Sequence, residues 1–159
     1  MTGIVILCVA LVAATAFGLW RRATDGRMHD VRPVPDADDA PPGQLHIADR
    51  GEHGGDVLTA AALGTSVLGS RATFVQFSSA FCAPCRATRV VLADVAATNP
   101  GVVHVDIDAE SHLDLVRALH IRRTPTVLVL DARGVIRQRA SGATRKADAL
   151  HALDALNEP

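Results

Sequence analysis

Three regions with different patterns of apolar and polar residues divide the 159-residue chain. Residues 1–20 contain no charged side chain, whereas residues 21–43 are rich in proline and aspartate and contain few bulky apolar residues. Residues 44–159 alternate short runs of β-forming apolar residues with segments in which apolar residues recur every three or four positions. The pattern predicts one globular domain that follows an apolar segment and a polar connection.

The apolar segment has the length of a membrane-spanning helix. Its 20 residues would span about 30 Å as a helix, which is the thickness of the hydrocarbon core of a bilayer. Trp20, Arg21 and Arg22 at its end are typical of the membrane interface. A cleaved signal peptide is the alternative, with the small residues 14–16 as the cleavage site, but no basic side chain precedes the apolar run. We therefore expect a single retained N-terminal transmembrane helix.

The charges around this segment indicate its orientation. Arg21, Arg22, Arg27 and Arg32 follow the segment and no basic side chain precedes it. The positive-inside rule places the C-terminal side of such a helix in the cytoplasm. We thus expect a single-pass membrane protein whose domain lies on the cytoplasmic side, with the extracytoplasmic side as the alternative. Residues 21–43 would be a flexible linker between the membrane and the domain.

Within residues 44–159 the pattern predicts an α/β domain. Strands are expected at residues 44–48, 72–78, 102–108, 126–131 and 135–141. Helices are expected at residues 56–63, 84–99, 110–120 and 144–157. The last two strands are separated by a short turn and form a predicted hairpin. This order of elements predicts a mixed central sheet with helices on both faces.

Charge and cysteine content narrow the class of function. The formal net charge is −1 and the arginines are dispersed, so nothing indicates nucleic-acid binding. Cys8, Cys82 and Cys85 are too few for the disulfide framework of a small secreted protein. Cys8 lies in the apolar segment, so the chemistry of the domain centres on the other two cysteines.

Cys82 and Cys85 stand between a predicted strand and a predicted helix, in the sequence FCAPC. Free N–H groups and the helix dipole at such a position lower the pKa of a thiol, and only the thiolate attacks a disulfide. Cys85 follows Cys82 by about one helical turn and can therefore resolve a mixed disulfide. Pro84 suits the first turn of the helix, where an N–H group is not needed. We interpret the pair as redox-active.

The cysteine pair has other possible interpretations. A zinc site needs four ligands, but the chain has no second Cys-x-x-Cys and its histidines show no paired spacing, so no metal site is expected. A structural disulfide between positions i and i+3 closes a loop too small to constrain the chain much. Two non-enzymatic roles stay as alternatives: a module that binds Cu(I) through the two thiols, and a redox-inert docking module.

Several motifs together resemble the thioredoxin family. FVQFSSAFCAPCRATRVVLADVA is followed by VVHVDID, by IRRTPTVLVLDARGVI and by SGATRKADALHALDAL. The resemblance covers residues 73–156 and implies a thioredoxin fold. It also implies that Pro125 is cis and lies against the cysteines. Phe81, Pro84, Thr124 and Pro125 would form the rim that receives a protein substrate.

Two positions depart from the usual pattern of that family. Gln76 stands six residues before the first cysteine, where the family has a buried aspartate that helps to deprotonate the second cysteine. His104 corresponds to a lysine near that aspartate. A glutamine cannot take up a proton at neutral pH. We therefore expect Gln76 and His104 to form a neutral buried pair, with His104 or water relaying the proton to Cys85; a packing role is the alternative.

The resemblance implies a thiol–disulfide oxidoreductase that works as a reductase, and the apolar segment implies that it is tethered to a membrane. Cys82 would attack a disulfide of a protein substrate, Cys85 would release the reduced product, and an electron-donor reductase would regenerate the dithiol. No bound cofactor is expected, because the two cysteines themselves hold the electrons. Replacements such as Gln76 also occur in extracytoplasmic reductases of the TlpA and ResA kind, which stay an alternative.

Overall fold

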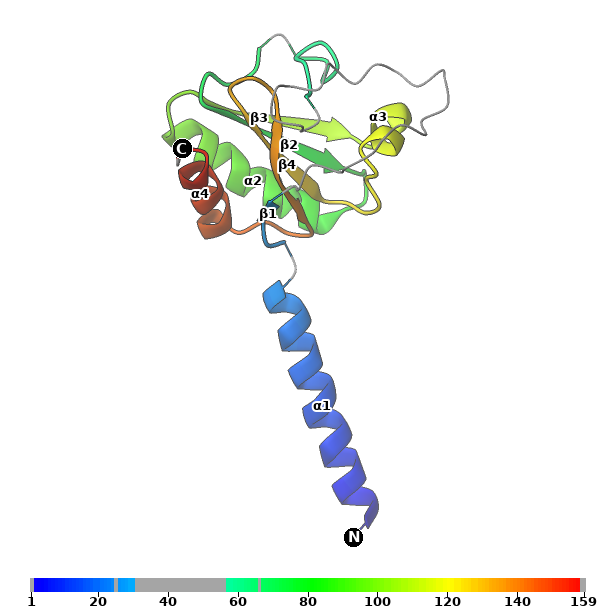
Figure 1. The fold of residues 1–159 in the computed structure, drawn as a ribbon. Coiled ribbons are helices and arrows are strands. Elements are labelled where there is room, and N and C mark those ends of the chain that lie inside the picture. Colours follow the sequence, from blue (N-terminus) through cyan, green and yellow to red (C-terminus); the bar gives the residue numbers. More distant parts are fainter. Residues whose placement is uncertain (1, 25, 31–56, 66, 158–159) are drawn as a thin grey trace, which may run out of the picture.

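The structure is a computed structural model that describes residues 2–24, 26–30, 57–65 and 67–157. A long helix, α1 (Thr2–Thr24), extends away from an α/β domain that contains both cysteines of the FCAPC motif (Figure 1). The domain is the predicted mixed sheet flanked by helices.

Among the described residues, five strands form one mixed sheet in the order β1-β5-β4-β2-β3. β2 is parallel to β3 and antiparallel to β4, and β5 is antiparallel to both β4 and β1. The strands are β1 (His29–Asp30), β2 (Ala72–Ser78), β3 (Val102–Asp108), β4 (Thr126–Asp131) and β5 (Ile136–Ser141). The pairing of β4 with β5 confirms the predicted hairpin.

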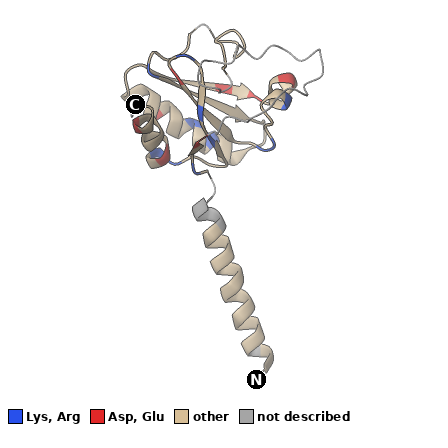
Figure 2. Ribbon diagram, viewed as in Figure 1, with Lys and Arg blue, Asp and Glu red and all other residues tan. Residues whose placement is uncertain are grey.

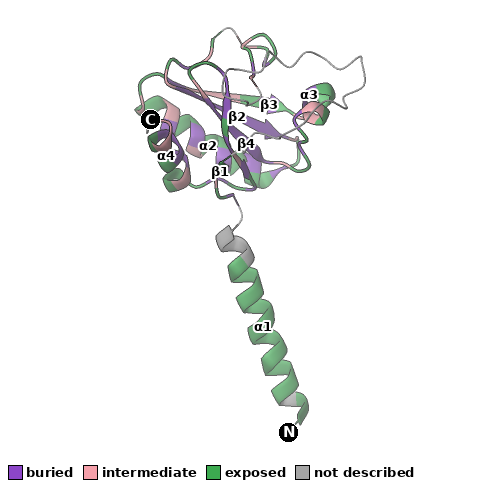
Figure 3. Cartoon of the chain, viewed as in Figure 1, coloured by how far each residue is buried: buried purple, intermediate pink, exposed green. Residues whose placement is uncertain are grey.

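Helices cover both faces of the sheet (Figure 1). α2 (Ala83–Thr98) and α4 (Lys146–Ala155) pack on one face, where Phe74 of β2 is buried against them. α3 (Leu113–Ala118), shorter than predicted, packs on the other face, where Phe77 is buried. Every residue of β2 is buried, because this central strand alternates its side chains between two covered faces (Figure 3). β2 thus fixes the position of the loop that carries the cysteines.

The predicted helix at residues 56–63 is wrong over its described part. Val57 forms an isolated bridge with Val135, and the N–H of Leu58 donates to the carbonyl of Gly134 at 2.8 Å. This long-range pairing keeps the start of the segment extended, and only a turn follows. The predicted strand at residues 44–48 lies outside the described residues.

Helix α1 covers the segment predicted to span a membrane and continues to Thr24. Its described residues are exposed and uncharged (Figures 2 and 3). Val12, Leu19 and Trp20 are each more than half exposed. In the stretches of chain that the structure describes, no helix meets the combined length and apolar content of a membrane span.

Residues 21–43 were expected to be a flexible linker, but residues 21–24 complete α1 and residues 26–30 dock on the domain. β1 extends the sheet by pairing with β5, and the side-chain amide of Gln138 donates to Asp30 Oδ1 at 3.0 Å. An uncovered strand edge exposes unpaired backbone groups. The docked segment supplies partners to β5, which is why it lies against the sheet.

Gly26→Ala is expected to release this segment from β5. Gly26 is buried with φ +78°, and its N–H donates to the carbonyl of Ser141 at 3.1 Å. An added Cβ would lie 1.9 Å from the carbonyl oxygen of Ala143, so the backbone must move. Trypsin should therefore cleave after Arg27 faster in this variant, while the domain stays folded. Gly18→Ala, whose Cβ meets nothing within 4 Å, is the control, and equal cleavage of both variants would contradict the expectation.

Candidate active site

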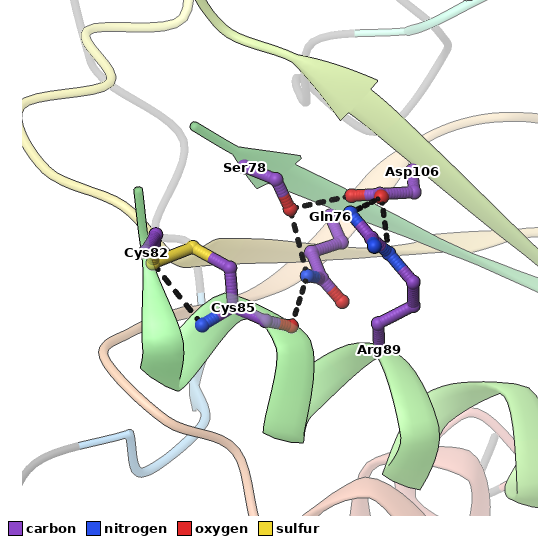
Figure 4. A network of polar contacts seen from close by, with 6 residues as sticks. All are labelled: Gln76, Ser78, Cys82, Cys85, Arg89 and Asp106. Atoms are coloured by element: carbon purple, nitrogen blue, oxygen red, sulfur yellow. Dashed lines mark hydrogen bonds and ion pairs between the residues drawn. A yellow bond between two sulfur atoms is a disulfide. The ribbon is translucent and has the colours of Figure 1, made fainter. Parts of the chain in front are cut away.

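Cys82 and Cys85 form a disulfide at the start of α2 (Figure 4). Cys82 is the N-cap residue, and its Sγ accepts the N–H of Cys85 at 3.1 Å. Pro84 occupies the first turn, as its missing N–H allows. The arrangement places Cys82 Sγ among the free N–H groups of the helix, where a thiolate is stabilised.

The two cysteines differ in exposure. Cys82 is 9% exposed and Cys85 is 1% exposed. A reagent or substrate that approaches from solvent therefore meets Cys82 first, and Cys85 reacts from behind it. This difference agrees with the order of attack that the sequence suggested.

The residues predicted to receive a substrate lie on two loops. Phe81 is fully exposed and Pro84 is exposed, next to Cys82 in the chain. The Thr124–Pro125 bond at the start of β4 is cis, as the family resemblance implied. The hydroxyl groups of Thr124 and Ser79 are 2.9 Å apart, which ties this loop to the loop that leads to Cys82. Binding of substrate by this rim stays a prediction.

Gln76 lies fully buried under the first turn of α2. Its amide Nε2 donates to the carbonyl of Cys85 at 2.9 Å and to Ser78 Oγ at 2.8 Å (Figure 4). One N–H group of Gln76 thus ties β2 to the turn that carries Cys85, and the other binds Ser78 of the same strand. A carboxylate at the same place would have no proton with which to make these two bonds.

A carboxylate is nevertheless present one strand away. Asp106 of β3 is directly opposite Gln76 in the parallel pairing of β2 and β3. Its Oδ1 accepts the hydroxyl of Ser78 at 2.5 Å, and its Oδ2 accepts Nε of Arg89 at 2.6 Å. The second guanidinium nitrogen of Arg89 also contacts Oδ2. Ser78, Arg89 and Asp106 were missed at the sequence level, although the alternation of β3 places Asp106 on the face that α2 covers.

The structure does not join Gln76 to His104. In the β2–β3 register His104 lies opposite Phe74, two residues from the level of Gln76. Gln76 Oε1 and His104 Nε2 are both buried and make no hydrogen bond within the described part of the chain. The expected neutral pair is therefore not formed, because the amide of Gln76 is directed to Ser78 and Cys85. A relay role of His104 stays a prediction.

The stability of the domain is expected to fall in acid partly because of His104. Burial lowers the pKa of His104 from its ordinary value of 6.5; Arg89 lowers it as well and Asp106 opposes both. The unfolded chain then binds a proton at a pH where the native state does not, so this contribution to stability is present above about pH 6.5 and is lost as the pH falls. His104→Gln should weaken the loss of stability between pH 7.5 and pH 5.5 in urea unfolding. The exposed His151→Gln is the control, and equal pH dependence of the two variants would refute the assignment.

A sheet whose central strand leads into a Cys-x-x-Cys disulfide at a helix N-terminus, with a cis-proline in the neighbouring loop, defines the class of thioredoxin-fold proteins. The profile of the thioredoxin family matches residues 56–155. The chain belongs to the thioredoxin family.

Curated relatives match a part of their own length. A putative thioredoxin H10 of Arabidopsis thaliana is 28% identical over 88 residues, which is 55% of this chain and 54% of that protein. Thioredoxin H4-1 of Oryza sativa subsp. japonica is 36% identical over 55 residues, which is 35% of this chain and 42% of that protein. The chain thus spans about half or less of the length of these relatives.

Solved structures share the fold. Thioredoxin NaTrxh from Nicotiana alata is 25% identical with a TM-score of 0.50, over 56% of this chain and 76% of that chain. A mutant thioredoxin from Halobacterium salinarum NRC-1 is 17% identical with a TM-score of 0.51, over 57% of this chain and 78% of that chain, which shows the fold alone.

Proposed function

We propose that the protein exchanges thiols and disulfides with protein substrates through Cys82 and Cys85. The observation that carries the proposal is the disulfide at the N-terminus of α2, with Cys82 as its more exposed cysteine. The Cys82 thiolate attacks a substrate disulfide and forms a mixed disulfide. Cys85 then attacks Cys82 Sγ, the substrate leaves with both of its sulfurs reduced, and the protein keeps the disulfide. Two electrons pass from the cysteine pair to the substrate.

The direction we propose is reduction of the substrate, with regeneration of the dithiol by an electron-donor reductase. Reduction of insulin disulfides by the full chain, with dithiothreitol as the donor, tests this activity. A rate no faster than dithiothreitol alone would reject it. The rim of Phe81, Pro84, Thr124 and Pro125 is the proposed contact surface, because it joins an exposed aromatic side chain to the loop beside the disulfide.

The two alternatives, a Cu(I)-binding module and a redox-inert docking module, predict no reduction of insulin disulfides. Among the described residues, no group of three or more His, Cys, Asp or Glu side chains is placed to hold a metal ion. Titration of the reduced chain with Cu(I), next to the insulin assay, separates the classes. Tight binding of copper without disulfide reduction would favour the metal-binding module.

We further propose that helix α1 holds the domain at a membrane. The support is an apolar, uncharged run at residues 1–20 whose described side chains are all exposed. The full chain should stay with membranes during extraction with alkaline carbonate and should leave them in detergent. Release of the unmodified chain by carbonate would overturn the tether, and Leu11→Arg, which places a charge within the run, is expected to be released.

The side of the membrane that we propose for the domain is the cytoplasmic one, on the arginines that follow residue 20. A Cys8→Ser variant leaves only the active-site cysteines. After treatment with a permeant reductant, a membrane-impermeant thiol reagent should label these cysteines only once the cells are lysed. Labelling in intact cells would reject this orientation and favour an extracytoplasmic reductase.

A further inference from the structure

The resolving step raises a problem of proton transfer at Cys85. Cys85 must lose its thiol proton before it can attack, yet it is 1% exposed and no carboxylate lies under it at position 76. Gln76 directs N–H groups, not a proton acceptor, toward Ser78 and the backbone of Cys85. The proton therefore needs another acceptor within reach of this turn.

Ser78 provides a directed path away from Gln76. Its Oγ accepts the amide of Gln76 at 2.8 Å and donates its own proton to Asp106 Oδ1 at 2.5 Å. A hydroxyl oxygen has two lone pairs, so Ser78 can accept one more proton donor while its own proton remains committed to Asp106. The chain of bonds runs from the buried strand β2 to the carboxylate (Figure 4).

A cavity beside the disulfide is shared by Cys85, which must lose the proton, and Asp106, where the chain of hydrogen bonds ends. Its volume is about 340 Å³, and Ser78, Cys85 and Asp106 all line it. Such a space has room for water, which fills about 30 Å³ per molecule in the liquid. The charged groups around Asp106 are Arg86 and Arg89 from α2 and the titratable His104 and Asp108 from β3.

Arg89 fixes which carboxylate oxygen faces the path. It contacts Oδ2 through two guanidinium nitrogens and leaves Oδ1 to Ser78. The side chain of Asp106 is 23% exposed, so a proton that reaches it can pass on to solvent. Asp106 therefore combines a hydrogen bond to the buried Ser78 with access to water.

We propose that Asp106 receives the proton of Cys85, through the hydroxyl of Ser78 or a water in the cavity, and so replaces the carboxylate that position 76 lacks. This inference rests on the proposed function. As the proton leaves, Cys85 Sγ forms a bond to Cys82 Sγ and the bond between Cys82 Sγ and the substrate sulfur breaks. The substrate leaves as a thiolate, which takes up a proton from solvent, and Asp106 returns to its charged form by releasing its proton.

The test measures the reactions of the two cysteines separately. The reduced full chain, in a Cys8→Ser background, reacts with the chromogenic disulfide 5,5′-dithiobis(2-nitrobenzoate). The first release of thionitrobenzoate reports attack by Cys82, and the second reports resolution by Cys85. Asp106→Asn should leave the first release unchanged and slow the second by about tenfold or more at pH 7. The deficit should shrink as the pH rises, because hydroxide then removes the proton of Cys85.

The sign of the change is informative. Loss of a negative charge alone would favour the Cys85 thiolate and quicken the second release, so slowing indicates loss of a proton acceptor. Ser78→Ala keeps Asp106 and distinguishes the two routes: the second release should slow if the Ser78 hydroxyl carries the proton and stay unchanged if water carries it. Asp108→Asn removes an equal charge from the same cavity and is the matched control.

An unchanged second release in Asp106→Asn, or an equal slowing in Asp108→Asn, would overturn the assignment of Asp106. Failure of the proposed function looks different. In that case Cys82 would give no first release, or the wild-type chain would not reduce insulin disulfides, whatever the residue at position 106.

Discussion

Replacing Cys85 by serine is expected to arrest the protein as a covalent mixed disulfide with its substrate. The more exposed Cys82 still attacks, but the sulfur that would release the substrate is missing. Cys82→Ser removes the accessible nucleophile and leaves a thiol that is 1% exposed, so no adduct should form. Turnover in the insulin assay should fall by about a thousandfold or more in both variants.

The two variants are distinguished by a non-reducing gel after incubation with a disulfide-containing protein. A band at the summed mass should appear for Cys85→Ser and vanish on addition of dithiothreitol. Both variants carry Cys8→Ser, because Cys8 is exposed and free and would form adducts of its own. A trapped band in Cys82→Ser in place of Cys85→Ser would reverse the roles of the two cysteines.

The regular part of the fold was predictable from local pattern. β2, β3 and β4 match their predicted bounds, because β2 and β4 are runs of β-forming residues that the sheet buries and β3 alternates apolar with polar residues, as a partly exposed strand does. The position of the cysteine pair was also predictable. The apolar patterns of the preceding strand and of the following helix place the pair at the N-terminus of that helix.

The features that sequence reasoning missed depend on contacts between distant segments. Residues 57–63 have a helical pattern, but Val57 pairs with Val135 across the domain. The link from Ser78 to Asp106 depends on the register of two parallel strands, which no local pattern specifies. The expected partner of Gln76 was His104, because the resemblance supplies positions but not the direction of a side-chain amide.

A substitution at position 76 tests whether this buried site can hold a carboxylate opposite Asp106. Gln76→Asp, which restores the carboxylate usual in the family, is expected to destabilise the domain by about 3 kcal/mol at pH 7. The new charge would be buried, would face the carbonyl of Cys85, and would lie directly across the strand pair from Asp106. Arg89 already binds Asp106 through two of its guanidinium nitrogens. Like charges opposite one another in a sheet repel.

The pH dependence of that loss identifies its cause. Burial and a neighbouring anion raise the pKa of a carboxyl group, so the native variant would bind a proton that the unfolded chain has released. The destabilisation should therefore be greatest above neutral pH and should shrink as the pH falls toward 4.5. Urea unfolding at both ends of this range measures it, with Gln76→Asn as the control that shortens the side chain without adding charge. If the Asp and Asn variants are equally stable at pH 7.5, position 76 can hold a carboxylate beside Asp106, and the charge on Asp106 is then not the reason for glutamine at this site.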